Sequence, residues 1–388
     1  MDNGVYYNPT KILFGKDMEK QIGEEVAPFA QRVLLVSGQN RAEQAGLLDR
    51  VRQSLTDAGV EFVELPGVRP NPALSTVWAG IRLARQEAVS LILAVGGGSV
   101  IDTAKAIAAG TPNSDDIWEY FEGSRTPAAV LPVAVVLTIA GSGSESSNSM
   151  VIRHDETDET RTYQDDRLRP VAAVLNPEVT YSLPAFNTAC GIADASCHVL
   201  EKYFTNTTDA DITDRLCEAV LRTLLETAPR AIERPNDYAA RSNLMWAAKV
   251  AHDGTLHVGR ERDTAARTIA HELTSRFGIT NGAAMAVLFP AWLAYVADHD
   301  PKRFQLFASR MMGADFPPEE AAAHVVDYVR QHFSRLGLPQ AMQDLGVDQE
   351  HFAEIAAAVA KKNGGQIGTY VPIGEKGILE ILNLAAEG

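Results

Sequence analysis

The sequence contains few cysteines, only Cys190, Cys197 and Cys217 among 388 residues. The count is odd and no pair has CxxC spacing, which argues against a disulfide framework and against a thiolate metal site. Free thiols are typical of a reducing compartment. We therefore expect a cytoplasmic protein.

Basic residues and long apolar runs are also scarce. The 35 lysines and arginines are outnumbered by 50 acidic residues, which gives a net charge of −15 and argues against a nucleic-acid partner. The longest apolar run, 130–140, is interrupted by Pro132 and Thr138 and falls short of the roughly 20 residues that span a bilayer. The first residues lack the pattern of a signal peptide. We expect no membrane partner.

The length of the chain and a change in its hydrophobic pattern near residue 184 predict two domains, 1–184 and 185–388. The first part alternates β-branched runs with helical patterns, which predicts a Rossmann-like domain with a mainly parallel sheet. Its expected strands lie within 32–38, 60–65, 90–99, 132–138 and 171–176. The second part predicts a helical bundle from amphipathic patterns at 186–204, 210–226, 238–256, 264–277, 302–312, 318–335 and 349–362. The fold class is therefore α/β followed by all-α.

A glycine-rich turn lies where one buried strand meets a helix. It reads Gly96, Gly97, Gly98 and Ser99, with Asp102 and Lys105 following on the same helix. Glycines allow a ligand to approach the backbone, and a helix N-terminus offers free N–H groups to a phosphate. A tight turn that needs glycine only for its geometry is the alternative. The added serine, aspartate and lysine favour phosphate binding.

A second loop rich in glycine and hydroxyls, 138–145, closes another predicted strand. Loops at the carboxyl edge of a parallel sheet are where ligands bind. We expect the two loops to form walls of one dinucleotide cleft. The acidic segment 154–161 lies between two extended runs and predicts a solvated hairpin tip.

Several motifs together resemble the iron-containing alcohol dehydrogenases: GGGSxxDxxK at 96–105, Pro-Asn-Pro at 70–72 and the run at 138–145. The start NPTKILFG and the segment 191–198 are similar to the butanol-dehydrogenase-like branch. The resemblance implies the iron alcohol dehydrogenase fold, which is dehydroquinate synthase-like, with a cleft between the domains. It also implies a homodimer that interconverts small alcohols and aldehydes with NAD(P).

The resemblance assigns three groups of residues to the cofactor. The pyrophosphate is expected on the glycine turn and its helix, and the hydroxyl loop is expected at the nicotinamide. The adenosine ribose is expected at the loop 37–41, which has no acidic residue, so NADP is favoured and NAD remains open. The residues in these groups are Gly96, Gly97, Gly98, Ser99 and Asp102; Thr138, Ser142 and Ser144; and Gly38, Asn40 and Arg41.

The metal site that the resemblance implies is incomplete. Asp194 and His198 share one face of a predicted helix, and two further histidines are expected at 267 and 281. The sequence has Arg267 and Asn281 there instead. A divalent iron or zinc needs three or four deprotonated ligands. We therefore predict no tightly bound metal, with Arg267 paired to Asp194 and Asn281 close by.

Two functions agree with this pattern. The first is an NAD(P)-dependent oxidoreductase with metal-independent chemistry, in which Arg267 stabilises the alkoxide and His271 or His198 relays the proton. An oxyanion or a carboxylate-bearing substrate would suit the arginine. The second is a catalytically silent, cofactor-binding protein. Without the resemblance, Asp194 and His198 would be read as a helix pair, His271 as a core residue and Arg267 as an ion-pair partner.

Overall fold

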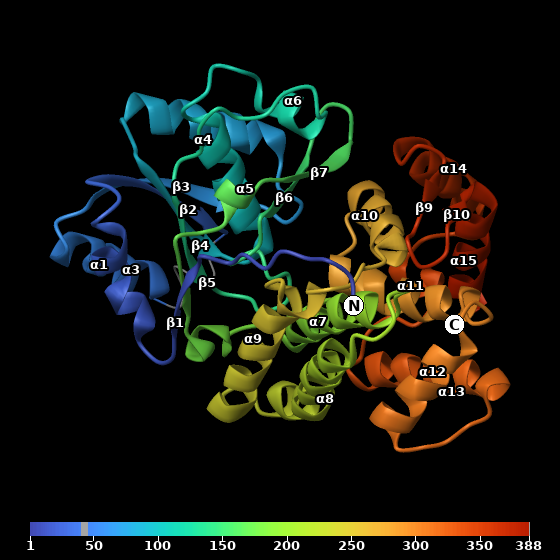
Figure 1. Cartoon of the computed structure of the whole chain (residues 1–388). Coiled ribbons are helices and arrows are strands. Elements are labelled where there is room, and N and C mark those ends of the chain that lie inside the picture. Colours follow the sequence, from blue (N-terminus) through green and yellow to red (C-terminus); the bar gives the residue numbers. More distant parts are fainter. Residues whose placement is uncertain (40–45, 388) are drawn as a thin grey trace. The chain divides into compact units, whose positions relative to one another are not determined.

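The computed structural model describes residues 1–39 and 46–387, and the chain divides into two compact units (Figure 1). The sheet unit comprises residues 7–183 and 235–253, and the helical unit comprises residues 1–6, 184–234 and 254 onward. The chain passes from the sheet unit to the helical unit between Leu183 and Pro184, beside the expected boundary at 184. The division differs from the expected ranges because the helix in 238–252 packs with the sheet and the first six residues pack with the helices.

The sheet unit is built on six parallel strands in the order β1-β8-β5-β4-β2-β3. Runs such as VLLV and LILAV are buried on both faces, as parallel strands covered by helices require. The strands are β1 (Lys11–Phe14), β2 (Arg32–Gly38), β3 (Glu61–Val68), β4 (Leu91–Gly96), β5 (Val133–Leu137) and β8 (Ala172–Leu175).

Alternate residues of each strand enter two apolar layers, one on each face of the sheet. Leu34 and Val36 pack in the layer formed with α4 and α5, whereas Val33 and Leu35 pack in the layer formed with α1 and α3. The helices of this unit are α1 (Ile22–Val26), α3 (Leu47–Asp57), α4 (Leu74–Gln86), α5 (Gly98–Gly110), α6 (Ile117–Phe121) and α9 (Tyr238–His252), with 3-10 turns η1 (Met18–Gln21), η2 (Asp166–Leu168) and η3 (Pro177–Thr180).

The strand order reverses beside β2. The chain leaves β2 for β3 on one side and then returns to β4 on the other side. In doubly wound sheets a ligand binds outside the carboxyl ends of the strands at such a reversal. The carboxyl ends that meet there carry Gly38 and the glycine turn at 96–98.

Two smaller features complete the sheet unit. β6 (Ser149–Arg153) and β7 (Thr160–Gln164) pair antiparallel, which confirms the predicted hairpin around the acidic tip. Helix α9 packs here because Met245 enters the apolar layer of α4 and α5, and Trp246 contacts Phe14 edge-on at 5.4 Å between ring centroids.

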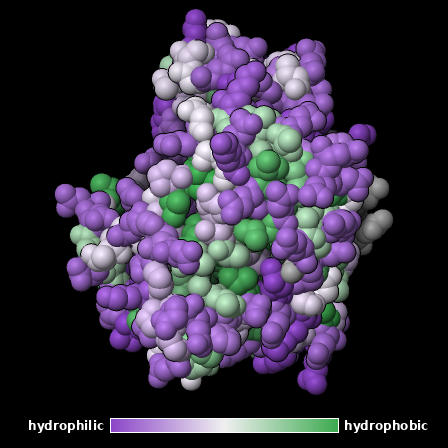
Figure 2. Space-filling model, turned by 90° about the vertical axis from the view of Figure 1, so that its right-hand side faces the viewer, coloured by the Kyte–Doolittle hydropathy of each residue, from purple (hydrophilic) through white to green (hydrophobic). Residues whose placement is uncertain are grey.

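The helical unit surrounds helix α7, whose residues 188–203 are all buried. Helix α11 is equally buried from Gly282 to Leu293. Hydrophilic side chains dominate the face shown in Figure 2. None of the helices described in residues 1–39 and 46–387 has the length and apolar character needed to cross a membrane. The elements are α7 (Ala185–Tyr203), α8 (Asp211–Glu233), η4 (Thr255–His257), α10 (Ala265–Phe277), α11 (Asn281–Tyr295), α12 (Pro301–Phe307), η5 (Ala308–Met312), α13 (Pro318–Arg335), η6 (Met342–Leu345), η7 (Gln349–His351), α14 (Phe352–Lys362), β9 (Gln366–Ile367), β10 (Ile373–Gly374) and α15 (Glu375–Glu387).

Candidate active site

The glycine turn leaves an open cradle at the N-terminus of α5. Gly97, Gly98 and Ser99 are partly exposed, although the strand before them is fully buried. A Cβ at Gly98 would lie 2.8 Å from Ser142 Oγ, and one at Gly96 would lie 2.4 Å from Val100. The first N–H groups of a helix have no partner within the helix, so they are available to an anion. The geometry therefore suits a phosphate.

The hydroxyl loop lies beside the glycine turn because β4 and β5 are neighbours. Thr138 N donates to Gly96 O at 3.1 Å. Ser144 Oγ donates to Asp102 Oδ1 at 2.6 Å, and Val151 N donates to Asp102 Oδ2 at 3.1 Å. Asp102 thus holds the loop against α5. Thr138 and Ser142 are partly exposed, whereas Ser144 is buried.

Lys105 supports the same loop from inside the unit. Its buried Nζ donates to Ser147 O and Ser149 O, each at 2.9 Å, and to Ser144 Oγ at 3.2 Å. Burial lowers the pKa of Lys105 to about 8, although the charges of Asp102 and Glu145 oppose that shift. Lys105 therefore connects helix and loop, and its amine points into the protein.

The expected ribose-binding loop is described only in part. Gly38 ends β2 at the strand reversal and is partly exposed. Asn40 and Arg41 lie outside the described residues. Their assignment to the cofactor stays a prediction.

In the helical unit, a buried guanidinium joins two carboxylates of α7. Arg267 Nη1 donates to Asp194 Oδ1 and Arg267 Nε donates to Glu201 Oε1, each at 2.7 Å. Asn281 Nδ2 donates to the same Asp194 oxygen at 3.1 Å. The predicted pair of Arg267 and Asp194 is confirmed. Glu201 was not predicted from the sequence, although its i+7 spacing from Asp194 places both on one helix face.

Two histidines lie beside this ion-pair network. His198 is buried between the carboxylates, with Nε2 at 3.6 Å from Asp194 Oδ1 and Nδ1 at 3.4 Å from Glu201 Oε2. Burial and the charge of Arg267 lower the pKa of His198 well below its ordinary value, and lower that of His271 to about 4. His271 lies one turn after Arg267 on α10. Both imidazoles are therefore neutral at pH 7.

Comparison with known proteins identifies the family. The iron-containing alcohol dehydrogenase model matches residues 9–177, and the model of the C-terminal part of that family matches residues 188–386. The chain belongs to the iron-containing alcohol dehydrogenase family. It is an oxidoreductase of the alcohol dehydrogenase type, and the predicted family and fold class are confirmed.

Relatives extend over the whole chain. NADH-dependent butanol dehydrogenase A of Clostridium acetobutylicum is 36% identical over 379 residues, which are 97% of each chain. NADPH-dependent aldehyde reductase YqhD of Escherichia coli is 34% identical over 95% of each chain. The crystal structure of a butanol dehydrogenase A from Thermotoga maritima superposes with a TM-score of 0.96 and 36% identity, covering 100% of this chain and 99% of that one.

The residues of this family member do not fit a divalent metal at Asp194 and His198. Asp194 already accepts from a guanidinium and an amide, and the permanent charge of Arg267 lies where a dication would have to approach. In the part of the chain that the structure describes, no group of three or more histidine, cysteine, aspartate or glutamate side chains could hold a metal ion. The three cysteines are free and buried.

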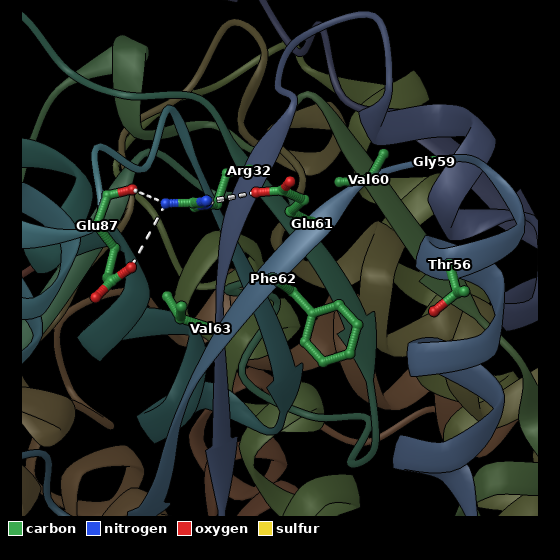
Figure 3. Close-up of a pocket in the computed structure, with 8 residues that line it drawn as sticks. All are labelled: Arg32, Thr56, Gly59, Val60, Glu61, Phe62, Val63 and Glu87. Carbon is green, nitrogen blue, oxygen red and sulfur yellow. Dashed lines mark hydrogen bonds and ion pairs between the residues drawn. The ribbon is translucent and has the colours of Figure 1, made fainter.

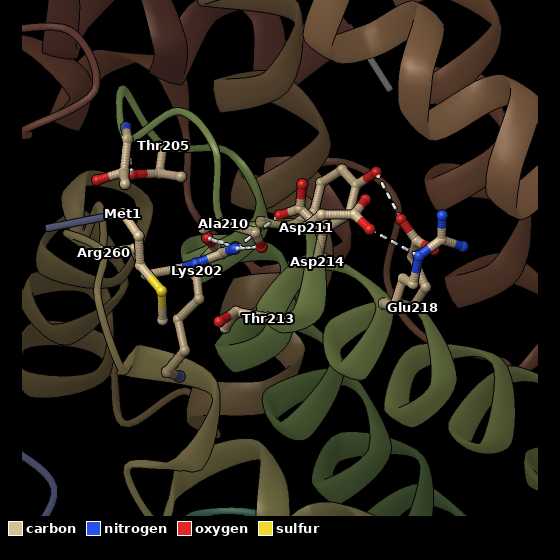
Figure 4. A network of polar contacts seen from close by, with 12 residues as sticks. Met1, Lys202, Thr205, Ala210, Asp211, Thr213, Asp214, Glu218 and Arg260 are labelled. Atoms are coloured by element: carbon tan, nitrogen blue, oxygen red, sulfur yellow. Dashed lines mark hydrogen bonds and ion pairs between the residues drawn. The ribbon is translucent and has the colours of Figure 1, made fainter.

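A second buried network fixes the end of α7 within the helical unit (Figure 4). Arg260 donates to Lys202 O at 2.9 Å and to Asp214 Oδ1 at 2.7 Å. Arg303 donates to Asp214 and to Tyr203 O. These arginines cap the carbonyls of the last turn and so hold the helix that presents Asp194, His198 and Glu201.

A surface hollow of about 510 Å³ lies at the opposite edge of the sheet, where β2 and β3 begin (Figure 3). Arg32 at its centre donates to Glu61 and to the carbonyl of Glu87. The arginine is therefore already paired. Ligands of doubly wound sheets bind at the carboxyl edge, so this hollow is not part of the candidate site.

Proposed function

We propose that this chain interconverts a small aldehyde and alcohol with NAD(P), and that Arg267 supplies the cation of the site in place of a metal. The observation that carries the proposal is the ion pair of Arg267 with Asp194 and Glu201. Relatives named as butanol dehydrogenases and an aldehyde reductase support the substrate class. A homodimer, as the resemblance implies, belongs to the same proposal and can be tested by light scattering.

The reaction can be balanced without a metal. In reduction, a bound reduced nicotinamide would supply a hydride with two electrons to the carbonyl carbon, and water would supply the proton that the oxygen gains. Arg267 keeps its positive charge, because Glu201 and Asp194 outweigh its burial and raise its pKa above the ordinary value. This charge would stabilise the negative charge that develops on the oxygen. In oxidation, the neutral imidazole of His271 would relay the proton of the alcohol to water, and in reduction the same imidazole would return a proton from water to the oxygen.

NADPH is the expected cofactor because residues 37–41 include no carboxylate to repel a 2′-phosphate. The relatives include both NADH- and NADPH-dependent enzymes. Fluorescence titration with both reduced cofactors decides the choice. Tighter binding of NADPH, weakened by added salt, is expected. Equal affinity or a preference for NADH contradicts it.

The proposal is tested with protein that has been dialysed against a chelator and analysed for metals by mass spectrometry. We expect less than about a tenth of an equivalent of iron or zinc, together with NADPH oxidation on a panel of short aldehydes. Activity that chelation abolishes and added metal restores would contradict the proposal. NADPH binding without turnover on any aldehyde or alcohol would instead support the second candidate, a cofactor-binding protein without redox activity, which the altered ligand positions favour.

A further inference from the structure

Two buried polar atoms beside Asp194 have no hydrogen-bond partner in the part of the chain that the structure describes: Arg267 Nη2 and Asn281 Oδ1. The groups that carry them meet at Asp194, because Arg267 Nη1 and Asn281 Nδ2 donate to one of its oxygens, at 2.7 and 3.1 Å. Each free atom belongs to the same planar group as the nitrogen that makes this contact. The two groups around Asp194 thus offer one unpaired donor and one unpaired acceptor.

Asp194 fixes which atom of the Asn281 amide accepts. Turning the amide over would place its oxygen against the Asp194 carboxylate, so the hydrogen bond to Asp194 determines the orientation. Arg267 is fixed in the same way, since Nε and Nη1 are both bound to carboxylates. Only Nη2 remains available to a ligand.

A buried donor and a buried acceptor cost free energy while they are unpaired, and one hydroxyl group can satisfy both. We propose that Arg267 Nη2 and Asn281 Oδ1 form a hydroxyl-binding subsite for an uncharged primary alcohol, on the position that the family gives to the metal. The alcohol oxygen accepts from Arg267 and its hydrogen is donated to Asn281. This inference rests on the proposed function and specifies its substrate contact.

The local charges favour an uncharged ligand over a carboxylate. The two carboxylates, Asp194 and Glu201, face Arg267, and Arg262 interacts electrostatically with the same Glu201. The buried amine of Lys202 also interacts electrostatically with Glu201. A carboxylate-bearing substrate would meet the negative charges of Asp194 and Glu201 beside the guanidinium, whereas they would not repel an uncharged alcohol. The subsite therefore favours an uncharged ligand, although the sequence suggested a carboxylate.

The test compares Asn281→Leu with Arg267→Lys in both reaction directions. An aldehyde has no hydroxyl hydrogen, so the Asn281 acceptor serves only the alcohol. In Asn281→Leu we expect KM for a short primary alcohol to rise about tenfold and KM for the matching aldehyde to change less than about twofold. Arg267→Lys should weaken both, because both oxygens accept from the guanidinium.

Thr280→Ala is the matched control, since Thr280 is the exposed neighbour of Asn281 and its side chain makes no capping bond. It should leave both KM values unchanged. If Asn281→Leu changes the KM values of alcohol and aldehyde equally, the subsite is overturned. It is also overturned if a carboxylate of equal chain length inhibits with an inhibition constant below the KM of the alcohol. If Arg267→Lys does not fold, the Asn281→Leu comparison decides the question.

Failure of the proposed function is seen separately, as wild-type protein that binds NADPH and turns over nothing. The subsite is then tested by ligand-observed NMR with a short primary alcohol. Saturation transfer to the alcohol in wild type and its loss in Asn281→Leu support the subsite. Equal signals in both proteins overturn it.

Discussion

Arg267 is a buried cation held by two carboxylates, so its removal should be costly. In Arg267→Ala, Asp194 and Glu201 would remain buried without the guanidinium that pairs them. Removing one partner of a buried ion pair typically costs about 3–5 kcal/mol. We expect the free energy of unfolding in urea to fall by about that amount.

Arg215→Ala is the control for this measurement. Arg215 pairs with Asp211 on the surface of α8, where the two side chains are 61% and 60% exposed. Exposed pairs contribute about 0–1 kcal/mol. A loss in Arg267→Ala no larger than that in Arg215→Ala would show that the buried pair does not stabilise the fold.

The same residues predict how a metal site could be restored. Arg267→His with Asn281→His removes the cation and places four potential ligands, with Asp194 and His198, around one point. We expect about one equivalent of zinc to remain after dialysis. Asn281→His alone should retain none, because the guanidinium stays against Asp194. Metal bound equally by the unmodified protein would contradict this reasoning.

At the scale of elements, the junction of β4 with α5 should decide cofactor binding. Gly97→Asp would place a carboxylate at the helix N-terminus where the pyrophosphate is expected, and its Cβ would lie 3.3 Å from Ile139. We expect NADPH affinity to fall at least about a hundredfold with little change in melting temperature. Thr126→Asp adds the same charge at an exposed position of the sheet unit. Unchanged affinity in Gly97→Asp would count against the placement.

The link between α5 and the hydroxyl loop should give a pH dependence. Lys105 has a pKa of about 8 in the folded chain against 10.5 ordinarily, so the unfolded chain keeps its proton to higher pH. Between these values the contribution of Lys105 to the free energy of unfolding rises with pH, and below about pH 8 it is constant. Urea unfolding near pH 7 and near pH 10 should show wild type gaining stability relative to Lys105→Met. If the free energies of unfolding of wild type and Lys105→Met change in parallel with pH, the lowered pKa of Lys105 is refuted.

The elements that the sequence predicted are those with a strong local pattern. The runs at 32–38 and 132–138 became β2 and β5, and the amphipathic pattern at 318–335 became α13. Helix α11 was missed because it is apolar all round and shows no stripe. Strand β1 was missed because four residues carry too little periodicity.

At the scale of the whole molecule, the candidate cofactor residues belong to the sheet unit and the ion-pair network belongs to the helical unit. The family resemblance, with the register that it gives to α7 and α10, predicted the pair of Arg267 and Asp194. The role of Glu201, and the unpaired atoms of Arg267 and Asn281, depend on side-chain rotamers and tertiary packing that no spacing specifies. The placement of α9 in the sheet unit was likewise unpredictable, because it depends on contacts such as that between Trp246 and Phe14.

This division predicts that cofactor binding and the ion-pair network can be changed independently. The glycine turn and hydroxyl loop lie in the sheet unit, whereas Arg267 and Asn281 lie in the helical unit. Titration of NADPH into Asn281→Leu and Arg267→Lys should therefore give dissociation constants within about twofold of wild type, even where turnover is lost, since residues that share no partners usually do not couple. Gly97→Asp is the reciprocal control, because it should lose NADPH and keep the stability that Arg267 provides. A tenfold or larger loss of NADPH affinity in the helical-unit variants would show that the two units bind the cofactor as one site.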